Sequence, residues 1–260
     1  MMKLGFIGMG NMAQALTAGW MESGALAAGE IGAYAPHQDK LQKNAERLGF
    51  VPFASARELV RAAEIVIFAC KPYQIEDVLA DIGPLLDGKA LISIALGWDY
   101  ERWQAALRGA ARVQFVMPNT PAQVREGIFL FEEIHSLTEE EEAFARSLFS
   151  ALGKVIALPS RLMEIGGTVS GCGPAFADMI MEAFADAGVK YGLPRALAYE
   201  LVSQMLLGSA KLQRDTKTHP AVLKDAVCSP GGSTIRGVAA LEEYGLRAAC
   251  LAAIDAVMEK

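Results

Sequence analysis

The sequence lacks any long apolar run, and none approaches the ~18–20 residues that a membrane-spanning helix needs. Charged residues are also sparse, at 21% of the 260 residues, and the formal net charge is −6 with no block of Lys or Arg. Proteins that bind nucleic acid usually carry a cationic stripe or patch. We therefore expect neither a membrane span nor a nucleic-acid partner.

Cysteine and histidine are scarce, with four and three residues respectively. The cysteines form no CxxC pair and the histidines show no HExxH spacing, so the sequence predicts neither a metal site nor a redox dithiol. The N-terminal apolar stretch is short and interrupted by glycines, which argues against a signal peptide. Free thiols without an export signal predict a cytoplasmic protein. The residues concerned are Cys70, Cys172, Cys228, Cys250, His37, His135 and His219.

Apolar sequence is abundant instead, at 52% of residues. Through residue 158, short apolar segments alternate with helical patterns, which predicts an α/β fold with a mostly parallel sheet covered on both faces. The predicted strands are Leu4–Ile7, Ile31–Tyr34, Glu64–Ala69, Ala90–Ala95, Arg112–Met117, Gly127–Phe131 and Lys154–Leu158.

Beyond Pro159 the sequence contains only helical patterns. We therefore predict two domains, an α/β domain over residues 1–158 and an all-helical domain over residues 159–260. The predicted helices of the second domain are Pro174–Tyr191, Pro194–Arg214, His219–Ala226 and Thr234–Glu259.

A glycine loop directly follows the first predicted strand and opens a helix, which is the context of the dinucleotide-binding fingerprint. Gly8 allows the tight turn, Gly10 lets a diphosphate approach the backbone, and Ala13 keeps helix and strand close. Glycines also mark ordinary turns, but in this context the loop predicts a nicotinamide dinucleotide cofactor.

The residues after the second predicted strand indicate which nicotinamide is used. NAD sites usually carry an acid there, bonded to the ribose hydroxyls. This chain has Tyr34, Ala35, Pro36 and His37 and no acid, which favours NADPH. His37 and Lys40 are the nearby cationic candidates for a 2′-phosphate, although either could be a plain surface residue.

A second small-residue loop, Ser229–Thr234, precedes another helical pattern. Unpaired backbone N–H groups at the start of a helix form a favourable binding site for an anion. Taken alone, the loop could equally be a sharp turn between helices.

Several segments, in their order and spacing, resemble the pyrroline-5-carboxylate reductase family. The resemblance extends over essentially the whole chain, and the segments around residues 170–176 and 223–235 are specific to this family. The matching segments are Phe6–Met12, Ala69–Pro72, Ser93–Gly97, Met117–Pro121, Ser170–Phe176, Leu223–Asp225 and Ser229–Ile235.

The resemblance implies a Rossmann-like N-terminal domain and an all-helical C-terminal dimerisation domain that interlocks with that of a partner. It implies hydride transfer from NADPH, with NADH as an alternative, to C5 of 1-pyrroline-5-carboxylate. The product is L-proline, so this is the final step of proline biosynthesis. It also implies homodimers, often gathered into decamers.

The same resemblance implies roles for individual residues. It places the Thr234 hydroxyl at the imine nitrogen as the catalytic donor. The substrate carboxylate would be held by Ser229, Gly231, Gly232, Ser233 and Thr234. The predicted cofactor contacts are Ile7, Gly8, Met9, Gly10, Asn11, Met12, Tyr34, Pro36, His37, Ala69, Cys70, Lys71, Pro72, Ala95, Leu96, Gly97 and Asn119.

Some of these residues also have plainer interpretations. Lys71 could be an exposed lysine at a strand end, and Asn119 could be a turn asparagine. The glycines of Ser170–Phe176 could serve helix packing at a subunit interface as well as ligand contact. Cys172 stands where the family commonly has Ser, and we expect a small buried thiol there because no base lies near it in sequence.

Departures from the family pattern leave alternatives open. Ala54–Ala56 lacks an Asn common in the family, Glu164 is the one acid retained before the motif at Ser170, and Ala226 replaces a polar residue. A paralogue acting on a related cyclic imine therefore remains an alternative, as does a catalytically silent regulator. A β-hydroxyacid dehydrogenase would need a catalytic lysine after a glycine-rich segment, and Gly171–Phe184 contains none.

Overall fold

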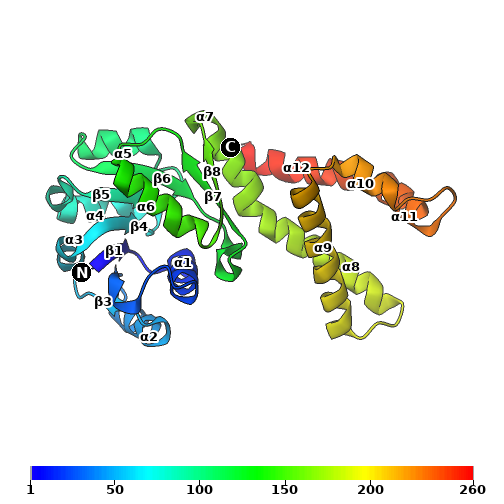
Figure 1. Ribbon diagram of the computed structural model, residues 1–260, viewed down its shortest axis with the longest axis horizontal. Helices are drawn as coiled ribbons and strands as arrows, with labels where there is room; N and C mark the ends of the chain where they lie inside the picture. The colour runs from blue at the N-terminus through cyan, green and yellow to red at the C-terminus, as the bar shows by residue number, and fades with distance from the viewer. Residues whose placement is uncertain (1, 260) are drawn as a thin grey trace. The chain divides into compact units, whose positions relative to one another are not determined.

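The structure is a computed structural model that describes residues 2–259. Figure 1 shows an α/β part followed by a helical part, and the chain divides into two compact units with their boundary between Gly171 and Cys172. This boundary lies beyond the predicted one after residue 158, because helix α7 (Ser160–Gly167) packs on the sheet of the first unit.

An eight-stranded sheet forms the centre of the first unit, in the order β3-β2-β1-β4-β5-β6-β7-β8. All neighbouring strands are parallel except β6 and β7, so the predicted mostly parallel sheet is confirmed. The strands are β1 (Met2–Ile7), β2 (Ile31–Tyr34), β3 (Val51–Pro52), β4 (Ala63–Phe68), β5 (Ala90–Ser93), β6 (Arg112–Met117), β7 (Gly127–Glu132) and β8 (Gly153–Leu158). The edge strand β3 was not predicted, since two residues give no readable alternation.

Helices cover both faces of this sheet, as the apolar strands require. One face packs against α1 (Asn11–Glu22), α2 (Gln38–Leu48) and α6 (Glu139–Ser150), and the other against α3 (Ala56–Ala62), α4 (Ile75–Ile82) and α5 (Tyr100–Leu107). Short 3₁₀ turns join several elements. They are Ala28–Glu30, Pro72–Gln74, Gly83–Leu86 and Thr120–Val124.

Large aromatic side chains fill the two resulting cores. On one face, Trp20 packs edge-on against Phe149 with ring centroids 5.3 Å apart. On the other face, Phe68 meets Trp103 at 4.7 Å. Side chains of this size bury a large apolar area and dominate core energetics. The first unit therefore has cores that hold the carboxyl ends of its strands in place.

A continuous helical segment leaves the first unit. Helix α7 runs into a π-helical turn, Thr168–Cys172, and then into α8. In α7, a Cβ at Gly167 would clash with the flexible end of the Met117 side chain, which would have to move to admit a larger residue. π-turns inside helices are often found at functional sites, and this one spans most of the Ser170–Gly173 motif.

The second unit contains only helices over residues 172–259, as predicted. They are α8 (Gly173–Lys190), α9 (Arg195–Thr216), α10 (Pro220–Ala226), α11 (Ser233–Glu243) and α12 (Leu246–Met258). Helices α8 and α9 pack side by side. The prediction of one helix over Thr234–Glu259 was wrong, because Gly245 adopts a left-handed conformation (φ +74°) that ends one helix and begins another.

Among residues 2–259, no helix is both long and apolar enough to cross a bilayer.

Candidate functional site

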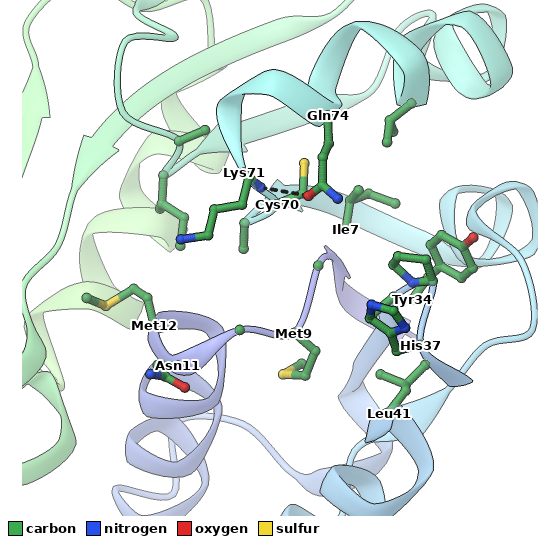
Figure 2. A pocket seen from close by; sticks show the side chains of 18 of the residues that line it. Ile7, Met9, Asn11, Met12, Tyr34, His37, Leu41, Cys70, Lys71 and Gln74 are labelled. Carbon is green, nitrogen blue, oxygen red and sulfur yellow. Dashed lines mark hydrogen bonds between the residues drawn. The ribbon is translucent and has the colours of Figure 1, made fainter. Parts of the chain in front are cut away.

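A cleft of about 830 Å³ opens at the carboxyl ends of β1, β2, β4 and β5. The strand order reverses between β1 and β4, and ligands of open α/β sheets bind at such a switch point. Figure 2 shows the cleft from close by. Its lining residues are Ile7, Gly8, Met9, Gly10, Asn11, Met12, Gln14, Tyr34, Ala35, Pro36, His37, Lys40, Leu41, Asn44, Ala69, Cys70, Lys71, Pro72, Gln74, Asp77, Val78, Ile94, Ala95 and Leu96.

The fold of the first unit requires a glycine at position 8. Its φ is +95°, and a Cβ there would lie 2.7 Å from the backbone N of Cys70 and 2.8 Å from the carbonyl carbon of Ala69. Its N–H donates to the carbonyl of Tyr34 over 2.8 Å. Gly8 thus lets the end of β1 fit closely between β2 and β4, as the fingerprint requires.

Gly10 differs from Gly8, because no protein atom lies within 4 Å of the position of a Cβ. The packing of the chain does not demand a glycine there, whereas a ligand approaching the backbone would. Gly10 is also the N-cap of α1, with no side-chain capping bond and no acid in the first turn. The positive end of α1 is therefore free of a competing carboxylate, which suits an anionic group.

The rim at the end of β2 carries nitrogen-bearing side chains. His37 is the N-cap residue of α2, and Lys40 and Asn44 follow at helical spacing on the same face. Figure 2 shows His37 beside Leu41 at the edge of the cleft. Asp77 is the acid in the lining, and it comes from α4 rather than from the end of β2. This rim is chemically suited to a phosphate group.

The opposite wall is formed by the segment after β4. The backbone N–H of Lys71 donates to Oε1 of Gln74 over 3.1 Å, which fixes the turn, and the Lys71 side chain extends toward Met12 in Figure 2. Burial raises the pKa of the Cys70 thiol to about 11 against a small opposing effect of its own backbone hydrogen bond. Cys70 is thus a neutral thiol at physiological pH, and it lines the cleft without acting as a nucleophile.

Two of the predicted cofactor residues lie outside this lining. Gly97 is in the loop after β5, where its carbonyl accepts from Nη1 of Arg102 over 3.2 Å. Asn119 is nearly buried, and its amide is engaged within the protein: Nδ2 donates to the carbonyl of Ser170 and Oδ1 accepts from the N–H of Ile128. The Asn119 side chain thus ties β6 to β7 and to the π-turn. All other predicted cofactor residues line the cleft, and their contact with a cofactor stays a prediction.

The second small-residue loop lies in the second unit, before α11. Gly231 has φ +67°, and Gly232 is the N-cap of α11, whose first residues are Ser233 and Thr234. The Gly232 N–H donates to the carbonyl of Ser229 over 3.0 Å. Helix α11 has no side-chain capping bond and no acid in its first turn, and the Thr234 side chain is exposed. The predicted substrate loop therefore presents the start of a helix to an anion.

The expectation of a buried Cys172 was wrong. The residue is half-buried at the last position of the π-turn, where the second unit begins. Its thiol is free, as are those of the other cysteines.

The sequence did not identify several lining residues. Leu41 and Asn44 could have been found by extending the helical period from His37, and Gln14 by extending it from Gly10. Asp77 and Val78 carry no such signal, because they reach the cleft through the placement of α4 against the sheet, and Gln74 lies in the 3₁₀ turn that precedes α4.

Comparison with known proteins agrees with this geometry. Residues 160–260 match the family model described as pyrroline-5-carboxylate reductase dimerisation, and residues 3–97 match that of the coenzyme F420-dependent NADP oxidoreductases. The pyrroline-5-carboxylate reductase of Treponema pallidum is 42% identical over 99% of both chains, and that of Escherichia coli is 40% identical over 99% of this chain and 96% of its own. The crystal structure of a pyrroline carboxylate reductase of Plasmodium falciparum with NADP bound superposes with a TM-score of 0.90 at 31% identity, covering 99% of this chain and 96% of that one. On this full-length similarity, the chain belongs to the pyrroline-5-carboxylate reductase family.

Proposed function

We propose that this protein catalyses the NADPH-dependent reduction of 1-pyrroline-5-carboxylate to L-proline. The observation that carries the proposal is the presence, in one chain of this family, of a dinucleotide-type cleft and of the Ser229–Thr234 loop at the start of α11. The cleft suits the cofactor and the loop suits a small carboxylate.

The cofactor proposal rests on the rim of the cleft. The end of β2 carries no acid that would bond ribose hydroxyls and repel a 2′-phosphate, while His37 and Lys40 stand at the rim. The related Plasmodium structure has NADP bound. NADPH, when bound, supplies the hydride, and Gly10 at the start of α1 would face its diphosphate.

The chain itself would bind, orient and polarise the substrate. Backbone N–H groups of Gly232, Ser233 and Thr234 at the start of α11 would hold the carboxylate. The Thr234 hydroxyl would donate to the imine nitrogen as carbon C5 is reduced. A hydroxyl orients but is not a strong acid, so the rate enhancement would come from positioning and electrostatics.

A spectrophotometric assay tests this function. We expect NADPH oxidation with 1-pyrroline-5-carboxylate to be faster than with pyrroline-2-carboxylate or piperideine-6-carboxylate, and slower when NADH replaces NADPH. Preference for another imine would identify a paralogue with a related substrate. No oxidation with any imine would favour a silent regulator, and equal efficiency with NADH would remove the NADPH preference.

The Thr234→Ala variant tests the catalytic role. We expect turnover to fall by about 100- to 1,000-fold, the usual effect of losing one positioned hydrogen-bond donor, with NADPH binding unchanged. Ser229→Ala is the control, because binding through backbone donors predicts only a small change. Near-normal turnover in Thr234→Ala would refute the role.

We further propose that the protein works in the cytoplasm as a homodimer, with a decamer built from five such dimers as the larger assembly. Support for the dimer comes from the second unit, where large apolar side chains such as Met179 and Leu251 are more than two-thirds exposed in the single chain. Apolar surface of this kind usually marks an interface. The free cysteines support a reducing compartment.

A further inference from the structure

One side-chain amide in the cleft forms hydrogen bonds through both its nitrogen and its oxygen, and the family motifs do not explain these bonds. Gln14 is the fourth residue of α1 and lines the cleft. Its Nε2 donates to the carbonyl of Met9 over 3.0 Å, and its Oε1 accepts from Nη2 of Arg47 over 2.5 Å. Arg47 lies in the last turn of α2, a different element on the same face of the sheet.

The chemistry of this contact leaves one orientation for the amide. A guanidinium only donates hydrogen bonds, so the atom of Gln14 that faces Arg47 must be the oxygen. The amide nitrogen then faces Met9, whose carbonyl can only accept. Arg47 therefore determines which group of Gln14 meets the glycine loop, and its charge strengthens the bond that it donates.

The bond to Met9 also determines where the next N–H group points. In a planar trans peptide, the carbonyl of Met9 and the N–H of Gly10 point in opposite directions. Holding the carbonyl toward Gln14 therefore aims the Gly10 N–H away from it. The backbone N–H of Gln14 holds the following carbonyl as well, through a 3.0 Å bond to Gly10.

We infer that Gln14 is a positioning residue for the cofactor, held in place by Arg47. Together they fix the Met9–Gly10 peptide, so that the Gly10 N–H is presented to the diphosphate without reorganisation when the dinucleotide binds. Fixing a donor in advance lowers the cost of binding. This inference rests on the proposed use of NADPH, and it assigns no chemistry on the imine to either residue.

Direct binding of NADPH, measured by fluorescence without any imine, tests the inference. We expect Gln14→Met, which keeps the length of the side chain but cannot hydrogen-bond, to raise the Kd for NADPH about three- to tenfold, the loss of one net hydrogen bond. The KM for NADPH should rise in parallel, while kcat at saturating NADPH stays at the wild-type value. A role in folding alone would lower Tm and leave Kd unchanged.

Arg47 gives a second and independent variant, because it is exposed and its removal leaves the core intact. We expect Arg47→Met to weaken NADPH binding and Arg47→Lys to restore most of it, since lysine can also donate to the amide oxygen. Arg61→Met is the matched control, an exposed arginine in the last turn of α3. It removes the same charge and should leave the Kd unchanged.

The double variant separates positioning from simple attraction of an anion. If Arg47 acts through Gln14, Arg47→Met adds nothing in the Gln14→Met background, whereas independent effects would add. Additive effects, or a Gln14→Met variant that binds NADPH like wild type, would overturn the inference while the proposed function stands. A wild-type protein that binds no NADPH would overturn both.

Discussion

The first unit buries Trp20, Trp98 and Trp103 completely, whereas among residues 172–259 the second unit buries only Ala185 and Ala198. Both units are rich in regular structure, so the difference lies in packing. A sheet with helices on both faces closes around its own apolar side chains. Helices that contact one another over a small area leave their apolar faces exposed to solvent.

The difference indicates where each unit obtains its stability. The first unit carries its own core, and the cleft is built on the rigid strand ends above it. The second unit exposes a long series of large apolar side chains in the single chain, among them Met179 at 69% and Leu251 at 68%, and extended apolar surface of this kind usually marks an interface. We therefore expect the second unit to depend on a partner surface, in keeping with the dimerisation family model that it matches.

The largest expected effect is in the core of the first unit. Trp20→Ala should lower the free energy of unfolding by about 3–5 kcal/mol, as for other buried aromatics. It removes a fully buried ring and the 2.8 Å hydrogen bond from Nε1 to the carbonyl of Leu148. Tyr191→Ala, at an 84% exposed position of the second unit, should change it by less than about 0.5 kcal/mol. Urea titration measures both, and similar losses would contradict the comparison.

Two glycines with positive φ give the next comparison. Gly8→Ala should destabilise the first unit by more than about 2 kcal/mol. The substitution combines backbone strain with a clash against the backbone of Ala69 and Cys70, just after β4. Gly231→Ala carries strain but no clash, because no atom lies within 4 Å of its Cβ position, so its cost should be about 1 kcal/mol. Thermal unfolding followed by circular dichroism ranks the two. The reverse order would show that the packing around Gly8 relaxes easily.

Introducing a charge on the exposed helices tests the dependence on a partner. Leu251→Asp should weaken self-association at least tenfold, the equivalent of about 1.4 kcal/mol, because a carboxylate would be buried against apolar surface. Ile134→Asp, at a 55% exposed position of the first unit, is the control and should leave the oligomer intact. Sedimentation velocity over a concentration series gives the result. A Leu251→Asp oligomer as tight as wild type would exclude this face from the interface.

The smallest expected effect concerns pH. Arg112 makes a bidentate ion pair with Glu141, with N–O distances of 2.8 and 2.6 Å, and these bonds from Arg112 hold the pKa of Glu141 below its usual value despite partial burial. A depressed pKa in the folded state contributes stability above the unfolded pKa of about 4.3, and this is lost as pH falls through the folded pKa. Glu141→Gln should therefore flatten the loss of stability below about pH 4, by less than about 1 kcal/mol for a pair near the surface. Glu139→Gln is the control, and an unchanged acid slope in Glu141→Gln would assign the slope to other carboxylates.

Local signals predicted much of the first unit. The strands at Ile31–Tyr34 and Arg112–Met117 have the predicted bounds, and the loop at Gly8 lies where the fingerprint placed it. These features depend on short-range sterics and on apolar continuity, which a sequence displays directly. The break at Gly245 was missed, because an isolated glycine in a helical pattern is often tolerated within the helix.

Side-chain direction was harder to predict than position. Asn119 follows a strand that ends at the correct edge of the sheet, yet its amide is bonded to Ser170 and Ile128. Those partners lie on β7 and on the π-turn, and no local pattern shows that they converge. Gln14 was missed for the same reason, since its partner Arg47 belongs to another helix.

The sequence by itself determined the alternation of strands and helices, the two glycine loops and the absence of an acid after β2, because each is a property of neighbouring residues. Only the tertiary structure decided that α4 brings Asp77 and Val78 to the cleft, that Arg47 reaches Gln14, and that the second unit has almost no core. The physical reason is that these contacts depend on the order and packing of elements far apart in the chain, which one sequence encodes only through the whole fold.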